Sequence, residues 1–280
     1  MFVLKRAFLI MLLSFAGASG YMALFEDNYI YFPAREVSST PAYFGMQFEE
    51  LHVTTTDGIT LHGWYMPVPS SRFTVLHLHG NAGNISHRLS LYRQWQAMGL
   101  SVYAIDYRGY GKSEGEPGEA GLYADARAAW RDATTRLGLK PESVIIAGRS
   151  LGAAVAAKLA REVKAAGLAL ETPFSNIPDM ASFHYPWLPL RWLAKSRFDA
   201  MESVKDVYLP LLLIAARDDS IAPAWMAEKV FAAANEPKKK VELAGGHNDF
   251  DHYSFMAYAV AWREWIGTLG TGGAGDIPRL

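Results

Sequence analysis

The chain has 280 residues, half of them apolar and a fifth charged, which excludes a disordered chain and fits a single α/β domain with a sizeable core. Its 27 basic and 28 acidic residues nearly cancel, so the total charge gives no indication of a nucleic-acid partner. The absence of cysteine excludes disulfides, thiolate metal ligands and a cysteine nucleophile.

The N-terminal segment, residues 1–27, is predicted to be a membrane anchor. Lys5 and Arg6 precede an uncharged stretch at residues 7–25, and Glu26 and Asp27 follow it. This stretch is close to the ~20 residues that a helix needs to cross the hydrocarbon core. Because the basic flank comes first, the positive-inside rule predicts a single-pass protein with the rest of the chain on the non-cytoplasmic side.

A cleaved signal peptide is the alternative interpretation of the same segment. Ala16-Gly17-Ala18 offers a cleavage site of the A-x-A kind after a short apolar run. In that case the mature protein would be secreted or periplasmic. Both interpretations export the rest of the chain.

Strand and helix patterns alternate through residues 28–269, the predicted main domain. A hairpin pair around Asp57-Gly58 joins predicted strands at residues 48–55 and 59–66. Continuous apolar runs, which suit strands buried on both faces, follow at residues 74–79, 101–105, 143–147, 168–170 and 210–215. Helical patterns lie at residues 122–137, 151–166 and 224–234. This alternation predicts an α/β fold whose functional groups gather at the carboxyl ends of a mainly parallel sheet.

Gly148-Arg149-Ser150-Leu151-Gly152 directly follows the strand at residues 143–147 and matches the pattern G-x-S-x-G. In this pattern a serine on a sharp strand-to-helix turn projects its hydroxyl from the sheet. Side chains two residues to either side would collide with neighbouring elements, which explains the glycines. Ser150 is therefore the candidate nucleophile, and an ordinary glycine-flanked turn is the alternative.

Two backbone N–H groups are candidates for an oxyanion hole. The N–H of Leu151 opens the helix that follows the serine, where the helix dipole favours negative charge. Asn81 lies at the tip of the strand at residues 74–79, so its N–H is the candidate second donor. A plain turn is the alternative for Asn81.

An acid and a base are expected after the serine in the chain, in the order Ser, Asp or Glu, His. The strand at residues 210–215 ends just before Asp218 and Asp219, and either carboxylate fits the pattern. A short strand at residues 240–243 precedes His247, which lies on a glycine-rich loop. His247 is the candidate base that would take the proton of Ser150.

Taken in series, these segments resemble the serine α/β-hydrolases, and more narrowly the membrane-anchored bud-emergence-like branch, which also contains depalmitoylases and lysophospholipase-like enzymes. The resemblance implies an eight-stranded sheet with an antiparallel second strand. It also selects Asp219 as the acid, because the family places the acid four residues before a proline. Ala153 and Ala215-Ala216 depart from the family pattern, which puts local packing in doubt. The motifs that carry the resemblance are YFP at 31–33, HGNAGN at 79–84, DYRGYG at 106–111 with Ser113, Gly115 and Pro117, GRSLG at 148–152, DSIAP at 219–223 and GHN at 246–248.

No cofactor and no metal is expected. Gly111-Lys112-Ser113 resembles the end of a phosphate-binding loop, but Asp106 stands where that motif requires glycine. His77 and His79 are predicted to share one face of a strand, yet no third ligand has a suitable local spacing.

A lid is predicted at about residues 173–205, and a flexible tail at residues 270–280. The aromatic, proline-broken run at residues 183–193 lies in a connection long enough to cover the strand ends. As a lid it would contact an acyl chain or the bilayer surface, and a short core helix with loops is the alternative.

The predicted activity is a serine hydrolase that cleaves carboxylic ester or thioester bonds of apolar, lipid-like acyl substrates through an acyl-enzyme. A peptidase or amidase is one alternative, since the same triad cuts amides. A non-catalytic membrane-tethered scaffold is another, because fold alone does not fix function. The sequence gives no prediction of oligomeric state.

Overall fold

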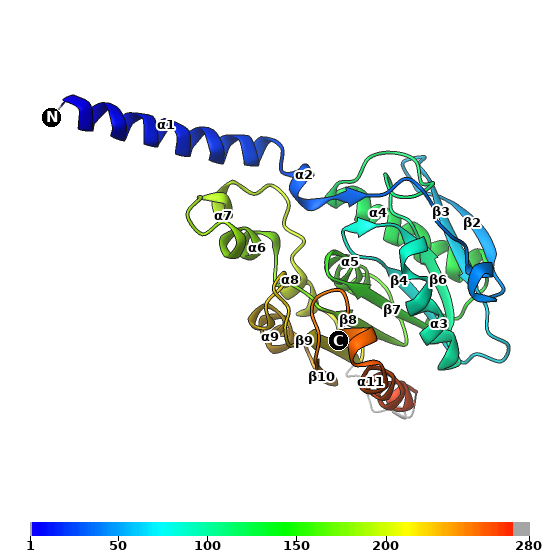
Figure 1. Cartoon of the computed structure of the whole chain (residues 1–280). Coiled ribbons are helices and arrows are strands. Elements are labelled where there is room, and N and C mark those ends of the chain that lie inside the picture. The colour runs from blue at the N-terminus through cyan, green and yellow to red at the C-terminus, as the bar shows by residue number, and fades with distance from the viewer. Residues whose placement is uncertain (1, 271–280) are drawn as a thin grey trace, which may run out of the picture.

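The computed structural model describes residues 2–270 and has an eight-stranded sheet at its centre (Figure 1). The strand order is β10-β9-β8-β7-β4-β6-β3-β2, and β3 alone runs antiparallel to both of its neighbours. The predicted fold class is therefore confirmed, including the antiparallel second strand. The strands are β2 (Glu49–Thr54), β3 (Thr60–Met66), β4 (Thr74–Leu78), β6 (Ser101–Ile105), β7 (Val144–Arg149), β8 (Gly167–Glu171), β9 (Leu211–Ala216) and β10 (Lys238–Leu243).

Helices connect the strands and cover both faces of the sheet (Figure 1). The long helix predicted at residues 151–166 ends six residues earlier than expected. The predicted tail lies outside the described residues except for Gly270. The helices are α1 (Phe2–Leu24), α2 (Asp27–Ile30), α3 (Leu89–Ala97), α4 (Glu119–Arg131), α5 (Leu151–Ala160), α6 (Ile177–His184), α7 (Leu190–Leu193), α8 (Ala200–Val204), α9 (Ala224–Ala233), α10 (Phe250–Tyr253) and α11 (Phe255–Thr268).

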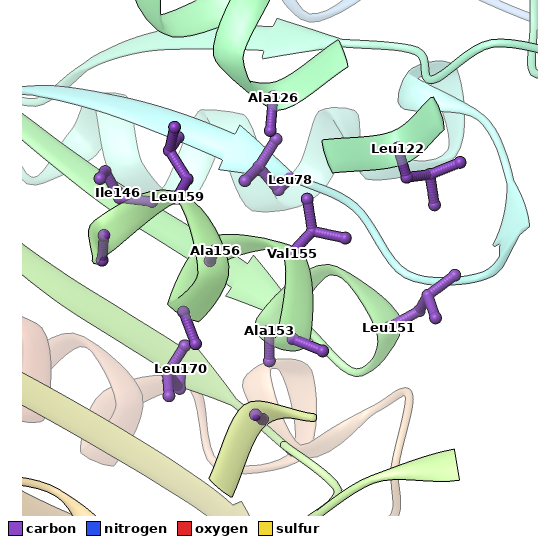
Figure 2. Packing of buried hydrophobic residues seen from close by; sticks show 14 of the residues in the cluster. Leu78, Leu122, Ala126, Ile146, Leu151, Ala153, Val155, Ala156, Leu159 and Leu170 are labelled. Carbon is purple, nitrogen blue, oxygen red and sulfur yellow. The ribbon is translucent and has the colours of Figure 1, made fainter. Parts of the chain in front are cut away.

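The core lies in two layers because side chains of a strand alternate between its faces. In β6, Tyr103 and Ile105 join the layer under α4, α5 and α9, and Val102 and Ala104 join the layer under α3 and α11. Figure 2 shows the first layer, in which α5 packs against the sheet with small side chains such as Ala153 and Ala156, and Ala126 of α4 meets Leu78 of the sheet. This close packing fixes the start of α5 at the carboxyl end of β7.

Helix α1 projects from the body of the molecule (Figure 1) and exposes apolar side chains along most of its length. It is 23 residues long and contains an 18-residue window with a mean hydropathy of 1.8, so it is long and apolar enough to cross a membrane. A signal sequence passes the same test. The N-terminal apolar segment thus fits either an anchor or a signal, as the sequence predicts.

The end of α1 is joined to the body at two places. A second, two-stranded parallel sheet pairs β1 (Phe32–Pro33) with β5 (Ala82–Gly83), in the loop that follows β4. The carboxylate of Glu26 accepts hydrogen bonds from the N–H groups of Lys195 and Ser196, at 2.9 and 3.1 Å. Residues 26–33 therefore bridge that loop and the segment that follows α7.

Candidate active site

Ser150 stands on the turn between β7 and α5, in a strained backbone conformation with φ 54° and ψ −115°. The flanking glycines are required because neighbouring backbone atoms leave no room for a Cβ at these positions. A Cβ at Gly148 would lie 2.1 Å from the carbonyl oxygen of Gly152, and a Cβ at Gly152 would lie 2.0 Å from that of Leu78. This is the sharp strand-to-helix turn on which a nucleophilic serine is presented in α/β-hydrolases.

Asp219 and His247 come together at the carboxyl ends of β9 and β10. The Nδ1 of His247 lies 2.7 Å from Oδ2 of Asp219, and both side chains are buried. The other oxygen, Oδ1, accepts hydrogen bonds from the N–H groups of Ile221 and Ala222 at 2.9 and 2.7 Å. A proton on Nδ1 held by the carboxylate leaves Nε2 as the acceptor nitrogen.

The neighbouring aspartate is used differently. The Oδ2 of Asp218 accepts a hydrogen bond from the N–H of Gly245 at 3.3 Å, so it holds the loop that carries His247. The carboxylate that faces the imidazole is that of Asp219, the residue that the family resemblance selects as the acid.

Ser150 and His247 line the same cavity. Within residues 2–270 no hydrogen bond joins the two side chains. Such bonds are often long in unliganded enzymes and shorten when substrate binds. The structure therefore places Ser150, Asp219 and His247 at one site, in which Asp219 and His247 are hydrogen-bonded and Ser150 and His247 are not.

Both candidate oxyanion donors also line this cavity. Leu151 is the first residue of α5, where N–H groups have no partner within the helix. Asn81 is fixed from both sides, because its side chain donates to the carbonyl of Ile30 and its own carbonyl accepts from Phe32 and Tyr110. Within the described residues, neither the N–H of Asn81 nor that of Leu151 donates a hydrogen bond to another protein group.

The cavity has a volume of about 450 Å³ and a mostly apolar lining. One wall comes from the predicted lid, including Phe174, Ile177 and Leu190. Another comes from the N-terminal segment, including Met22 and Tyr29. Sequence reasoning missed this second wall, although the YFP motif at residues 31–33 was a signal that the segment following the anchor belongs with the hydrolase motifs.

Arg149 stabilises the turn that carries Ser150. It is the variable residue after the first glycine of G-x-S-x-G. Its guanidinium forms hydrogen bonds of 2.7 and 2.9 Å to Glu171, lies 3.3 Å from Asp251 and stacks over the ring of Phe250. Burial opposes its charge, but the two carboxylates outweigh burial and raise the pKa of Arg149. The carbonyl of Glu171 also accepts the N–H of Ser150, so this ion pair holds the nucleophile turn in place.

The two histidines of the β4 region do not share a face, contrary to expectation. His77 packs against Tyr92 and Trp95 of α3, whereas His79 packs against Tyr107 on the other side of the sheet. The reason is that β4 ends at residue 78, so the alternation of the strand does not extend to His79. Within residues 2–270 no group of three or more ionisable side chains is arranged to hold a metal ion.

Comparison with known proteins agrees with this architecture. The family model described as serine aminopeptidase, S33 (Hydrolase_4), matches residues 69–198. The structure resembles the esterase Pf2001 of Pyrococcus furiosus with a TM-score of 0.72 at 20% identity, over 86% of this chain and 97% of that one. The fold and the nucleophile turn therefore define an α/β-hydrolase.

Curated relatives narrow the class. The chain is 41% identical to the uncharacterized protein Rv2307c of Mycobacterium tuberculosis, over 80% of this chain and 81% of the relative. It is 33% identical to the protein bem46 of Schizosaccharomyces pombe, over 80% of this chain and 79% of the relative. The chain belongs to the Hydrolase_4 family of α/β-hydrolases, in the bud-emergence-like branch that contains bem46.

Proposed function

We propose that the chain is a serine hydrolase that cleaves carboxylic ester or thioester bonds of apolar acyl substrates. The observation that carries the proposal is that Ser150 and His247 border one largely apolar cavity, with His247 hydrogen-bonded to Asp219 behind it. The similar Pyrococcus protein is described as an esterase, which supports the same reaction class.

The reaction begins when Nε2 of His247 takes the proton of Ser150 as its hydroxyl attacks the acyl carbonyl carbon. Asp219 holds the imidazole in the required tautomer and stabilises its positive charge. The N–H groups of Asn81 and Leu151 donate to the oxyanion of the tetrahedral intermediate, a contribution of about 3 kcal/mol in comparable sites. The imidazolium then returns its proton to the departing alcohol or thiol, which leaves an acyl group on Ser150.

The second half repeats the first with water as the nucleophile. His247 takes a proton from water, and the hydroxide attacks the acyl-enzyme at the same carbonyl carbon. The oxyanion collapses, the ester bond to Ser150 breaks, and the serine recovers its proton from the imidazolium. The carboxylic acid leaves through the apolar cavity.

The test is labelling with a fluorophosphonate together with a panel of p-nitrophenyl esters and thioesters of increasing chain length. Ser150→Ala should abolish labelling and lower turnover by ~10³-fold or more. Ser143→Ala is the matched control, because Ser143 lies just before the opposite end of β7 and bonds the carbonyl of Lys140. Absence of labelling in the wild-type chain would support the scaffold alternative, and faster cleavage of aminoacyl p-nitroanilides would support a peptidase.

We also propose that α1 is retained as an anchor and that the catalytic domain lies on the non-cytoplasmic side. The cavity wall includes Met22 near the end of α1, and the exposed Trp187 and Trp192 lie on the predicted lid. Tryptophan is enriched at the membrane–water interface, so the lid would rest on the bilayer and admit substrate from it.

The absence of cysteine makes the topology easy to test. Tyr43→Cys and Val3→Cys each introduce one exposed thiol, in the domain and in α1. On intact cells an impermeant maleimide should label Tyr43→Cys, and Val3→Cys should react only after lysis. The reverse pattern contradicts the orientation, and loss of the Val3→Cys thiol from the mature chain shows a cleaved signal.

A further inference from the structure

Arg88 lines the active-site cavity and has no carboxylate partner among residues 2–270. Its Nη2 donates to the carbonyl oxygen of Ala82 at 2.7 Å, and its Nε is buried without a hydrogen-bond partner. The second arginine in the cavity wall, Arg149, is by contrast fully engaged by Glu171 and Asp251.

Arg88 is half-buried, with its Nε fully covered, and a guanidinium shielded from water without a counter-ion is unfavourable. Burial and the positive charge of Arg149 lower the pKa of Arg88, against smaller opposing contributions that include Asp251 and Asp106. Arginine nevertheless stays protonated at neutral pH, so its donors require an acceptor. The acceptors that match its planar fork of N–H groups are carboxylate and phosphate.

No side chain in the described cavity wall supplies that acceptor. Glu26 is the one carboxylate there, and both of its oxygens accept backbone N–H groups of Lys195 and Ser196. Arg88 therefore borders a cavity in which no protein carboxylate meets its guanidinium. Ser150 borders the same cavity, so one substrate can reach both.

We propose that Arg88 is a specificity-determining residue that binds an anionic group, phosphate or carboxylate, carried by the substrate. The inference rests on the proposed ester hydrolysis and deepens it: the substrate is a single-chain acyl ester with a negatively charged end. The apolar walls hold the acyl chain, and the anion lies against Arg88 while the ester carbonyl lies at Ser150.

The test compares two esters that differ by one phosphate group, 1-oleoyl lysophosphatidic acid and 1-oleoylglycerol. In the wild type kcat/KM should be higher for the anionic ester, and Arg88→Gln should lower the ratio of the two values by about 10-fold or more, the effect of losing a hydrogen bond to a charged group. Arg93→Gln, at an exposed arginine of α3, the helix that begins directly after Arg88, should leave the ratio unchanged. Equal losses on both esters would mean that Arg88 only supports the Asn81 loop, and would overturn the proposal.

Further arms identify the source of the anion. Preference for mono-p-nitrophenyl glutarate over p-nitrophenyl butyrate places the charge on the acid side of the ester. Inhibition of wild type by inorganic phosphate, relieved in Arg88→Gln, assigns the subsite to a free anion. If Arg88→Gln does not fold, wild-type inhibition by the ether analogues of the two lipids gives the same comparison, and equal inhibition constants refute the subsite.

The inference and the proposed function fail in different ways. If the wild type neither labels with fluorophosphonate nor hydrolyses any ester, the proposed function is wrong. If it labels and hydrolyses neutral esters without any preference for charge, only the role of Arg88 is wrong.

Discussion

Acidification is expected to destabilise this protein through a histidine that is buried in its neutral form. The ring of His79 is fully buried, with Nδ1 2.7 Å from the carbonyl oxygen of Gly80. Its Nε2 has no hydrogen-bond partner and lies 3.7 Å from Oδ1 of Asp106. Burial lowers the pKa of His79 to about 4, from 6.5 in an exposed histidine, and the nearby Asp106 carboxylate offsets only part of this effect.

The sign follows from proton linkage. Below pH 6.5 the unfolded chain binds a proton at residue 79, whereas the folded chain stays neutral there until the pH approaches 4. The contribution of His79 to stability is therefore complete above pH 6.5 and is lost as the pH falls toward 4. Between pH 7 and pH 4.5 the loss is about 2 kcal/mol. His77 acts in the same direction, because burial holds its pKa well below the ordinary value.

The assay is urea unfolding of the full chain in detergent micelles, followed by tryptophan fluorescence at pH 7 and pH 4.5. His79→Phe keeps a ring against Tyr107 but removes the titration, so its loss of stability on acidification should be about 2 kcal/mol smaller than that of the wild type. His52→Phe, at an exposed position of β2, should behave like the wild type. Equal losses in wild type and His79→Phe would refute the reasoning, since His79 would then be protonated in the folded state.

Three further substitutions probe the site. Asp219→Asn should lower kcat on p-nitrophenyl butyrate by about 10³-fold or more with an unchanged circular dichroism spectrum, because the amide cannot hold the imidazole in the same tautomer; an unchanged kcat contradicts the assigned acid. Gly152→Ala places a Cβ 2.0 Å from the carbonyl of Leu78 and should lower both the melting temperature and fluorophosphonate labelling, which a wild-type labelling rate would disprove. Arg149→Met leaves the buried carboxylate of Glu171 without its partner and should cost about 3–5 kcal/mol in urea unfolding, whereas Arg149→Met with Glu171→Gln should recover part of that loss.

Much of the fold and the candidate triad was predictable because short-range patterns carry them. Fully buried parallel strands are continuous apolar runs, and Ser150 and Asp219 each follow such a run closely in the chain, whereas His247 follows the edge strand β10. Strand β10 begins at Lys238, two residues before the predicted start, inside a run of lysines. At the edge of the sheet these side chains reach solvent, and Lys239 pairs with Glu264, so a charged run can still form a strand.

The parts that the sequence does not predict depend on contacts between distant segments. The pairing of β1 with β5 brings residues 32–33 next to residues 82–83, and no local sequence pattern predicts a strand of two residues. The unpaired state of Arg88 likewise depends on which carboxylates surround it in space. Burial and partner choice of this kind arise only when the whole chain has folded.

The way in which residues 22–33 close the cavity sets the boundary for producing a detergent-free version of the protein. Truncation within α1 before Met22 removes most of the exposed apolar side chains and keeps the cavity wall that Met22 and the following residues form near Ser150. Truncation at residue 34 instead deletes Glu26 and β1. The loop that carries Asn81 then loses its pairing with β1, and the end of the predicted lid loses the hydrogen bond between Lys195 and Glu26. A recombinant protein truncated at residue 34 would be soluble, but one wall of its cavity would be missing. Its substrate selectivity would therefore differ from that of the intact protein.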